Sequence, residues 1–117
     1  MVAFNRGSGG EMSDGLLGEG DGNLAKPNLP PKFSLGQVVA TPGALAAVTQ
    51  RDILVALHRH QGGDWGLVDK EDWEANNRAL LESTRLVSAY KAVGGERFWI
   101  ITEADRSVTT ILLPCEY

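Results

Sequence analysis

Three β-rich runs in the last third of the chain constrain the fold more than any other feature of the sequence. They cover residues 85–91 (RLVSAYK), 97–103 (RFWIITE) and 108–113 (VTTILL), and each is rich in β-branched and aromatic residues. Turn-forming residues separate them, with glycines over residues 93–96 (VGGE) and a more polar turn over residues 104–107 (ADRS). The three runs therefore predict an antiparallel meander of three strands.

The segment before the meander begins with one short strand. Residues 33–40 (FSLGQVVA) contain β-branched positions and end at Thr41-Pro42. Thr41 and Pro42 also suit the N-cap and the first position of a helix over residues 43–48, because proline's fixed φ fits there and its missing donor is not needed.

Two further helix starts follow. Thr49 with Asp52 three residues later has the shape of an N-terminal cap, so either one kinked helix or two short helices result. Gly62-Gly63 ends this helical region, and Asp69 caps a third helix. Three residues are expected to form the apolar stripe of that third helix: Trp73, Leu80 and Leu81. The sequence thus predicts an α+β fold in which an N-terminal strand and two or three helices precede a three-stranded antiparallel meander packed against the helices.

The composition of the first 32 residues differs from that of the rest of the chain. They contain seven of the fourteen glycines and three of the five prolines, whereas every Trp and Tyr lies at residue 65 or later. Such a segment has too little apolar surface to offset the entropy of ordering its glycines. We therefore expect a flexible tail over residues 1–32 and a single α+β domain over residues 33–117.

Charge and hydropathy exclude several classes of function. A net charge of −4 and a pI near 5.1 leave no basic surplus for a phosphate backbone, so nucleic-acid binding is disfavoured. No run approaches the roughly 20 apolar residues that span a bilayer, and the start lacks the apolar stretch of a secretory signal, so a cytoplasmic location is expected. The lone Cys115 supplies neither an internal disulfide nor the sulfur-rich set of a structural zinc site.

The middle run of the meander places apolar residues on both of its faces. Phe98, Ile100 and Thr102 fall on one side, and Trp99, Ile101 and Glu103 fall on the other. A sheet covered by helices on one side normally carries polar residues on its free side. The second face therefore needs a cover, which could be the N-terminal leader, a helix or another subunit, and a partner surface is favoured over the first two.

Two histidines are candidates for metal binding or proton transfer. His58 and His60 are two residues apart, so on a helix their imidazoles point about 200° from each other and cannot share one ion. Histidines in a last turn also complement the helix dipole, which predicts a surface role and no metal site.

Two loops contain the remaining candidate residues. Asp64 and Trp65 lie between glycines, where the carboxylate can accept turn amides and the indole can fill the core, with contact to a ligand as the alternative. Glu103, Asp105 and Arg106 crowd a strand-turn junction, which is a solvated turn by default and also the first choice for a functional surface. The predicted binding residues are Asp64, Trp65, Arg97, Trp99, Glu103, Asp105 and Arg106.

Enzyme chemistry finds no support in the sequence. There is no nucleophile motif, no helical His-Glu pair and no phosphate-cradling glycine loop, and the glycines near residue 10 have no strand before them. No catalytic residue or cofactor is therefore assigned.

Several segments resemble a known group of proteins. They are residues 58–66 (HRHQGGDWG), 69–80 (DKEDWEANNRAL), 85–90 (RLVSAY) and 98–117 (FWIITEADRSVTTILLPCEY). Between about residue 39 and the end, the chain resembles small bacterial proteins carried on plasmids and integrated elements, labelled plasmid-related protein or type I restriction enzyme subunit M. The glycine-rich tail and Cys115 depart from the pattern. The resemblance implies a mobile-element context and no established activity, and a methyltransferase would need a cofactor-binding domain larger than this chain.

Three hypotheses of function follow. The first is a non-enzymatic protein-interaction or regulatory accessory protein, which acts through Trp99, Ile101 and the Asp105-Arg106 turn on a protein partner or a second copy of itself. The second is a toxin of the RelE/ParE type or another small nucleic-acid-acting protein, by analogy of fold alone. The third is a metal-binding protein that uses the two histidines and Asp64.

Overall fold

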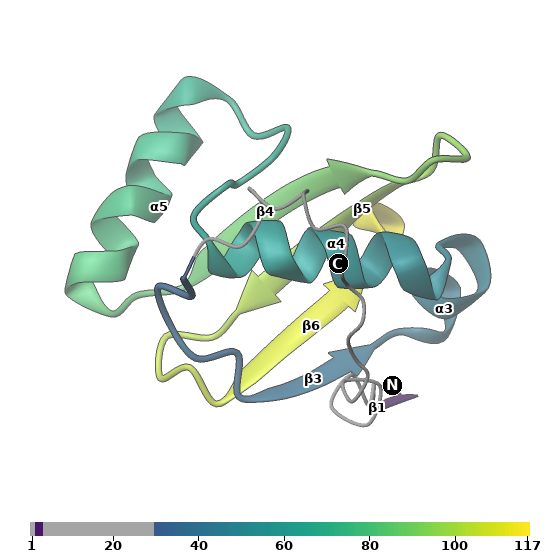
Figure 1. Cartoon of the computed structure of the whole chain (residues 1–117), viewed down its shortest axis with the longest axis horizontal. Coiled ribbons are helices and arrows are strands. Elements are labelled where there is room, and N and C mark those ends of the chain that lie inside the picture. The colour runs from purple at the N-terminus through teal and green to yellow at the C-terminus, as the bar shows by residue number, and fades with distance from the viewer. Residues whose placement is uncertain (1, 4–29) are drawn as a thin grey trace.

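The computed structural model describes residues 2–3 and 30–117 of the chain. The elements are β1 (Val2–Ala3), β3 (Gln37–Ala40), α3 (Pro42–Ala47), α4 (Gln50–Gln61), α5 (Lys70–Glu82), β4 (Leu86–Lys91), β5 (Arg97–Thr102), β6 (Val108–Leu112) and the 3₁₀ turn η1 (Pro114–Glu116). Strand, helices and then strands follow one another along the chain (Figure 1). The predicted α+β class is confirmed.

All strands belong to one sheet of order β1-β3-β6-β5-β4. Strands β4, β5 and β6 form the predicted antiparallel meander. Strand β3, which precedes the helices, pairs in parallel with β6, so the sheet as a whole is mixed. Val2–Ala3 pairs antiparallel with β3. The rest of the predicted flexible tail, up to residue 29, lies outside the described residues.

The helix starts follow the capping chemistry expected from the sequence. The side chains of Thr41, Thr49 and Asp69 each accept a backbone N–H three residues later. Because Val48 leaves helical geometry, residues 42–61 form two helices and not a single kinked one. Gly62 caps α4 and Gly63 has φ +90°, which is the left-handed region that glycine enters at no steric cost.

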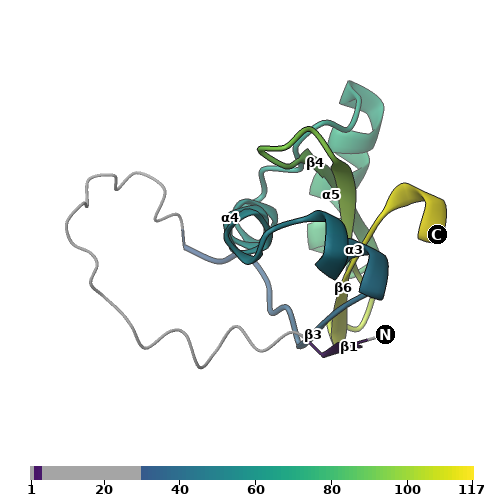
Figure 2. The ribbon, with the colours of Figure 1, turned by 90° about the vertical axis from the view of Figure 1, so that its right-hand side faces the viewer.

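Helix α4 lies along one face of the sheet, and the sheet separates it from η1 (Figures 1 and 2). Strand register shows which residues share a face. A row of residues that are paired across neighbouring strands is called here a rung. Three rungs face α4: Val38–Thr109–Thr102–Leu86, Ala40–Ile111–Ile100–Ser88 and Phe98–Tyr90. These residues are all buried, and the main core lies between these rungs and the apolar residues of α3 and α4.

Helix α5 lies beside the β4 edge of the sheet and encloses a second, smaller core (Figure 1). Trp65, Ala79 and Leu86 are buried there, with Trp73 and Leu80 partly buried against them. Leu81, which was expected in the apolar stripe, is 87% exposed. Leu81 lies about 100° around the helix from Leu80, which places it outside the buried face. Asn76 is buried on that face.

Among the described residues, no helix has both the length and the apolar character needed to cross a bilayer.

Candidate functional site

The face of the sheet opposite α4, called here the outer face, is the candidate site. Its rungs are Val39–Thr110–Ile101–Val87, Leu112–Trp99–Ala89 and Arg97–Lys91. Two of these rungs are almost wholly apolar, and no described α-helix lies over them. Ile101 and Leu112 are buried by their neighbours, whereas Val39, Val87, Ala89 and Trp99 keep intermediate exposure. The structure thus shows the second apolar face that residues 97–103 predicted.

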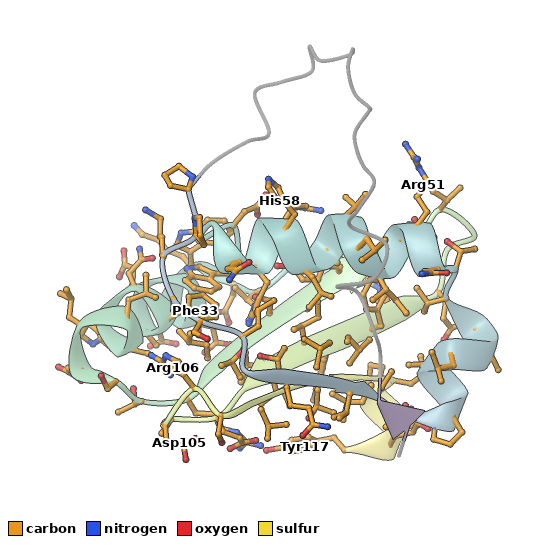
Figure 3. The ribbon with its side chains drawn as sticks, turned by 60° about the horizontal axis from the view of Figure 1, so that its bottom comes forward. Phe33, Arg51, His58, Asp105, Arg106 and Tyr117 are labelled. Atoms are coloured by element: carbon orange, nitrogen blue, oxygen red, sulfur yellow. The ribbon has the colours of Figure 1, made fainter. Side chains whose placement is uncertain are left out.

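The end of the chain covers part of the outer face. The Tyr117 ring meets the Trp99 ring edge-on, with centroids 5.5 Å apart. Arg85 lies over the same tyrosine ring at 5.5 Å, and its Nη1 donates to the tyrosine hydroxyl at 2.9 Å. Arg85 also lies 3.7 Å from a carboxylate oxygen of Glu103. Figure 3 shows Tyr117 on the opposite side of the sheet from His58 and Arg51.

Glu116 holds this C-terminal segment in place. Its carboxylate accepts the Thr41 hydroxyl at 2.5 Å, the Leu113 amide at 2.9 Å and the Gly43 amide at 3.2 Å. The hydrogen bond from Thr41, followed by that from Leu113, holds the pKa of Glu116 below its usual value. A Cβ at residue 43 would press on this carboxylate, so the observed contact of Glu116 with the Gly43 amide relies on the absence of a side chain there. The anchor ties the end of the chain to the start of α3.

A pair of cations lies at one end of the outer face. Lys91 and Arg97 are directly opposite each other on β4 and β5, and both are exposed. Like charges at directly opposed positions repel and destabilise a sheet. Among residues 2–3 and 30–117, neither side chain has an ion pair or hydrogen-bond partner. The next rung on the same face contains Ala89 and Trp99.

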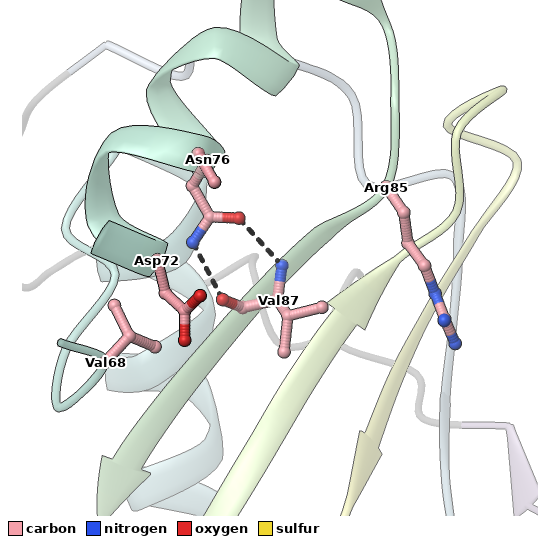
Figure 4. Close-up of a pocket in the computed structure, with 6 residues that line it drawn as sticks. Val68, Asp72, Asn76, Arg85 and Val87 are labelled. Carbon is pink, nitrogen blue, oxygen red and sulfur yellow. Dashed lines mark hydrogen bonds between the residues drawn. The ribbon is translucent and has the colours of Figure 1, made fainter. Parts of the chain in front are cut away.

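A pocket of about 320 Å³ adjoins the outer face at the β4 edge, and Figure 4 shows its lining. Val68, Ala75 and Val87 give it apolar walls, and Asp72 and Arg85 supply charged groups. Asn76 closes one side and pairs with the strand itself. Its amide nitrogen donates to the Val87 carbonyl at 2.8 Å, and its oxygen accepts the Val87 N–H at 3.1 Å.

The same edge of β4 is closed further along by the loop before α5. The Ala89 amide donates to the Trp65 carbonyl at 3.2 Å, and the Ala89 carbonyl accepts the Leu67 amide at 2.7 Å. Gly66 between them has φ +77°, and a Cβ there would lie 2.0 Å from the Ala89 carbonyl oxygen. Free edge strands template pairing with other chains. Here the backbone groups of Val87 and Ala89 are already satisfied, which leaves the outer face, and not this edge, as the available surface.

Asp64 and Trp65 have the structural roles predicted as one alternative. Trp65 is fully buried, and its indole N–H donates to Asn77 at 3.0 Å. Asp64 accepts the Gly66 amide at 3.1 Å and pairs with Arg59 at 2.8 Å. The Arg59 hydrogen bond and the Gly66 amide outweigh burial and lower the pKa of Asp64. Neither side chain lies on the outer face.

The turn after β5 is organised by two of its own residues. Asp105 accepts both the amide and the hydroxyl of Ser107, which lowers its pKa. Arg106 has φ +63°, and its guanidinium turns inward toward the C-terminus of α5. It donates to four backbone carbonyls, those of Ala79, Thr84, Glu103 and Ala104. The observed ion-pair partner of Glu103 is Arg85.

His60 is fully buried, so the predicted surface role is wrong for this residue. It sits on the inner side of α4, where its Nδ1 lies 2.5 Å from the Ser88 hydroxyl and its Nε2 lies 2.9 Å from the Thr102 hydroxyl. Burial, reinforced by the charge of Arg106, lowers the pKa of His60 to about 3. Both ring nitrogens are used by the core, and no cluster of three metal-ligating side chains occurs among the described residues.

No protein-family model, curated protein sequence or solved structure matches the chain.

Of the predicted binding residues, Arg97, Trp99 and Glu103 lie on the outer face, with Arg97 and Glu103 at opposite ends of β5. Asp105 lies at an exposed turn, and Asp64, Trp65 and Arg106 are occupied within the fold. The sequence analysis missed Lys91 and Tyr117. Lys91 could have been found from the alternation of side chains between the two faces of the strand over residues 85–91, which places Lys91 on the same face as Ala89. Tyr117 gave no signal, since its contact depends on the Glu116 anchor.

Proposed function

We propose that the protein is a non-enzymatic protein-interaction or regulatory accessory protein whose partner docks on the outer face. The observation that carries this proposal is the pair of apolar rungs that contain Trp99 and Ile101, which no described α-helix covers and which the C-terminal segment covers only in part. An antiparallel sheet that faced only water would carry polar residues there. Tryptophan and tyrosine are also among the residue types enriched at protein interfaces, and here Trp99 has intermediate exposure and Tyr117 is exposed.

The proposed occupant is another protein chain. The outer face has a cation pair at one end and an Arg85–Glu103 ion pair at the other. An apolar centre with a charged rim is the usual anatomy of a protein interface. The resemblance to small plasmid-borne proteins suggests that the partner belongs to a bacterial mobile element or its host.

A photo-cross-linking residue placed on the outer face tests this function. Thr110 has intermediate exposure in the middle of an outer rung, so we substitute it with p-benzoylphenylalanine in the native cell. We expect a discrete cross-linked protein product. The control places the same residue at the exposed Arg51, which points away from the sheet (Figure 3). Equal products from both positions, or none from Thr110, would contradict the proposal.

A second variant links the product to the apolar rungs. Thr110→Arg introduces a charge at the centre of the outer face while leaving the buried rungs intact. The variant should fold, as judged by circular dichroism and thermal unfolding, and it should lose the partner that the unmodified chain retains in pull-down. Retention of the partner by a folded Thr110→Arg protein would place the interface elsewhere.

A further inference from the structure

The charges of the outer face indicate what kind of partner it fits. Lys91 and Arg97 are opposed on neighbouring strands, where the Cβ atoms of such a pair are about 5 Å apart. The charged ends of these exposed side chains have no counter-charge among the described residues, so they repel each other across solvent. A bound carboxylate between them would convert that repulsion into two charge-assisted contacts.

The described chain has no carboxylate in position to do this. Glu96 is next to Arg97 in sequence, but it pairs with Ala92 across the turn and so falls on the α4 side of the hairpin. Glu103 lies on the outer face, at the far end of β5, and it pairs with Arg85. A carboxylate that bridges the two cations would therefore come from outside residues 2–3 and 30–117, and without one the cations are screened only by solvent and salt.

The spacing of the rungs selects an extended ligand. Arg97 and Trp99 are two residues apart on one strand, and so are Lys91 and Ala89, so the cation rung and the Trp99 rung are about 6.6–6.8 Å apart. An extended peptide repeats its side chains at the same interval along one side. A peptide that runs along β5 can thus place an acidic residue on the cations and an apolar residue, two positions away, on Trp99.

We infer that the partner docks through an extended acidic segment, in which carboxylates pair with Lys91 and Arg97 and an apolar side chain packs on Trp99. This inference rests on the proposed function and adds the chemistry of the ligand. A nucleic acid would also bring negative charge, and its bases can stack on tryptophan, so the test below includes an oligonucleotide as the competing ligand.

Nuclear magnetic resonance titration of the full chain tests this inference with defined probes. The probe is a twelve-residue synthetic peptide in which Leu-Ser-Glu-Ser is repeated, so that leucine and glutamate alternate along one side. We expect it to shift the amide signals of Lys91 and Arg97 and the indole signal of Trp99. The matching Leu-Ser-Lys-Ser peptide should cause no such shifts, and added salt should weaken binding of the acidic probe.

A charge-matched pair of variants locates the binding site. The double variant Lys91→Gln/Arg97→Gln should bind the acidic probe about tenfold more weakly, because two charged contacts are lost. The control Arg51→Gln/Arg78→Gln changes the net charge equally at two exposed positions on α4 and α5, and it should bind like the parent chain.

The alternatives give different results. Equal binding of the basic peptide, unchanged affinity in the Lys91→Gln/Arg97→Gln protein, or no shift with the acidic probe would overturn the acidic-segment inference. Tighter binding of oligothymidylate at the same residues would replace it with a nucleic-acid ligand, and a dimer in light scattering with the same shifts would replace it with a second copy. A cross-link from Thr110 would meanwhile uphold the proposed function, so failure of the two can be told apart.

Discussion

At the scale of single residues, the chain of hydrogen bonds around His60 determines which of its ring nitrogens carries the proton. The Thr109 hydroxyl donates to the Leu35 carbonyl at 2.7 Å, so its oxygen must accept from Thr102, which lies 2.7 Å away. With its own proton used, Thr102 accepts from His60 Nε2–H, and the unprotonated Nδ1 accepts from Ser88. The core therefore holds the neutral imidazole in one tautomer. A second proton, on Nδ1, would remove the acceptor of the Ser88 hydroxyl.

This arrangement predicts a loss of stability in mild acid. The pKa of His60 falls from 6.5 in the unfolded chain to about 3 in the folded protein. Between these values the unfolded state binds more protons, so the free energy of unfolding decreases as pH falls, by about 1.4 kcal/mol per pH unit. We expect a loss of about 2 kcal/mol between pH 7.5 and pH 5 from this group, measured by urea unfolding at each pH.

Two histidine variants separate this effect from other titrations. His60→Gln keeps a donor and an acceptor but cannot titrate, so its stability should change much less between pH 7.5 and pH 5. His58→Gln, at the exposed histidine of the same helix, should retain the full pH dependence. If the His60→Gln and parent proteins showed the same slope, the core network would not be the cause.

Arg106 offers a second prediction at this scale. Its guanidinium ties the C-terminus of α5 to the turn after β5, through the carbonyls of Ala79, Thr84 and Glu103 among others. Arg106→Asn keeps a residue that tolerates the observed φ of +63° but removes these contacts. We expect about 2 kcal/mol of destabilisation in chemical unfolding. Arg78→Gln, at an exposed site of α5, should change stability by less than about 0.5 kcal/mol.

At the scale of elements, the β4 edge is closed by a side chain and a loop where a further strand would otherwise pair. Asn76 presents an amide to Val87 in the way that a neighbouring strand presents its peptide group. Gly66 permits the loop to approach Ala89 closely enough for the next pair of backbone hydrogen bonds. Helix α5 is thereby fastened to the sheet by polar contacts as well as by its small core.

Removal of the Asn76 amide should therefore weaken this edge. Asn76→Ala leaves the Val87 N–H and carbonyl without partners, so we expect about 2–3 kcal/mol of destabilisation and faster hydrogen exchange at the Val87 amide. Glu74→Gln, at an exposed position of the same helix, serves as the control. An Asn76→Ala protein with unchanged exchange at Val87 would show that another group closes the edge.

At the scale of the whole molecule, both cores lie within residues 33–113. Of the first 29 residues, the structure describes only Val2–Ala3, which adds a two-residue strand to β3. A chain that begins at Pro30 should therefore unfold in one cooperative transition, within about 2 kcal/mol of the full chain. Calorimetry of the two proteins measures the difference.

A slightly longer deletion supplies the contrast. Removal of residues 1–36 also takes away Phe33, which packs against His60 and Trp65, and Leu35, which is 1% exposed and accepts the Thr109 hydrogen bond. This protein should fail to unfold cooperatively. Similar behaviour of both truncated chains would contradict the placement of the domain boundary between residues 30 and 33.

Local chemistry made several elements predictable. Thr41, Thr49 and Asp69 start helices through hydrogen bonds within three residues, and alternation along residues 97–103 divides that strand into two apolar faces. Leu81 was misplaced because helical periodicity alone does not say how wide the buried stripe is, and His60 because a favourable position in the last turn of a helix does not say which way the side chain faces. A polar residue in a core is recognisable only when its hydrogen-bond partners, here on two distant strands, are known.

The sequence by itself determined the order of elements, the meander and the presence of a second apolar face, because capping, turn chemistry and strand alternation act between near neighbours. Tertiary structure decided that β3 joins β6 in parallel, that Asn76 closes the β4 edge, and that Lys91 and Arg97 oppose each other beside Trp99. These features depend on strand register and on contacts between residues far apart in the chain, which no local pattern encodes.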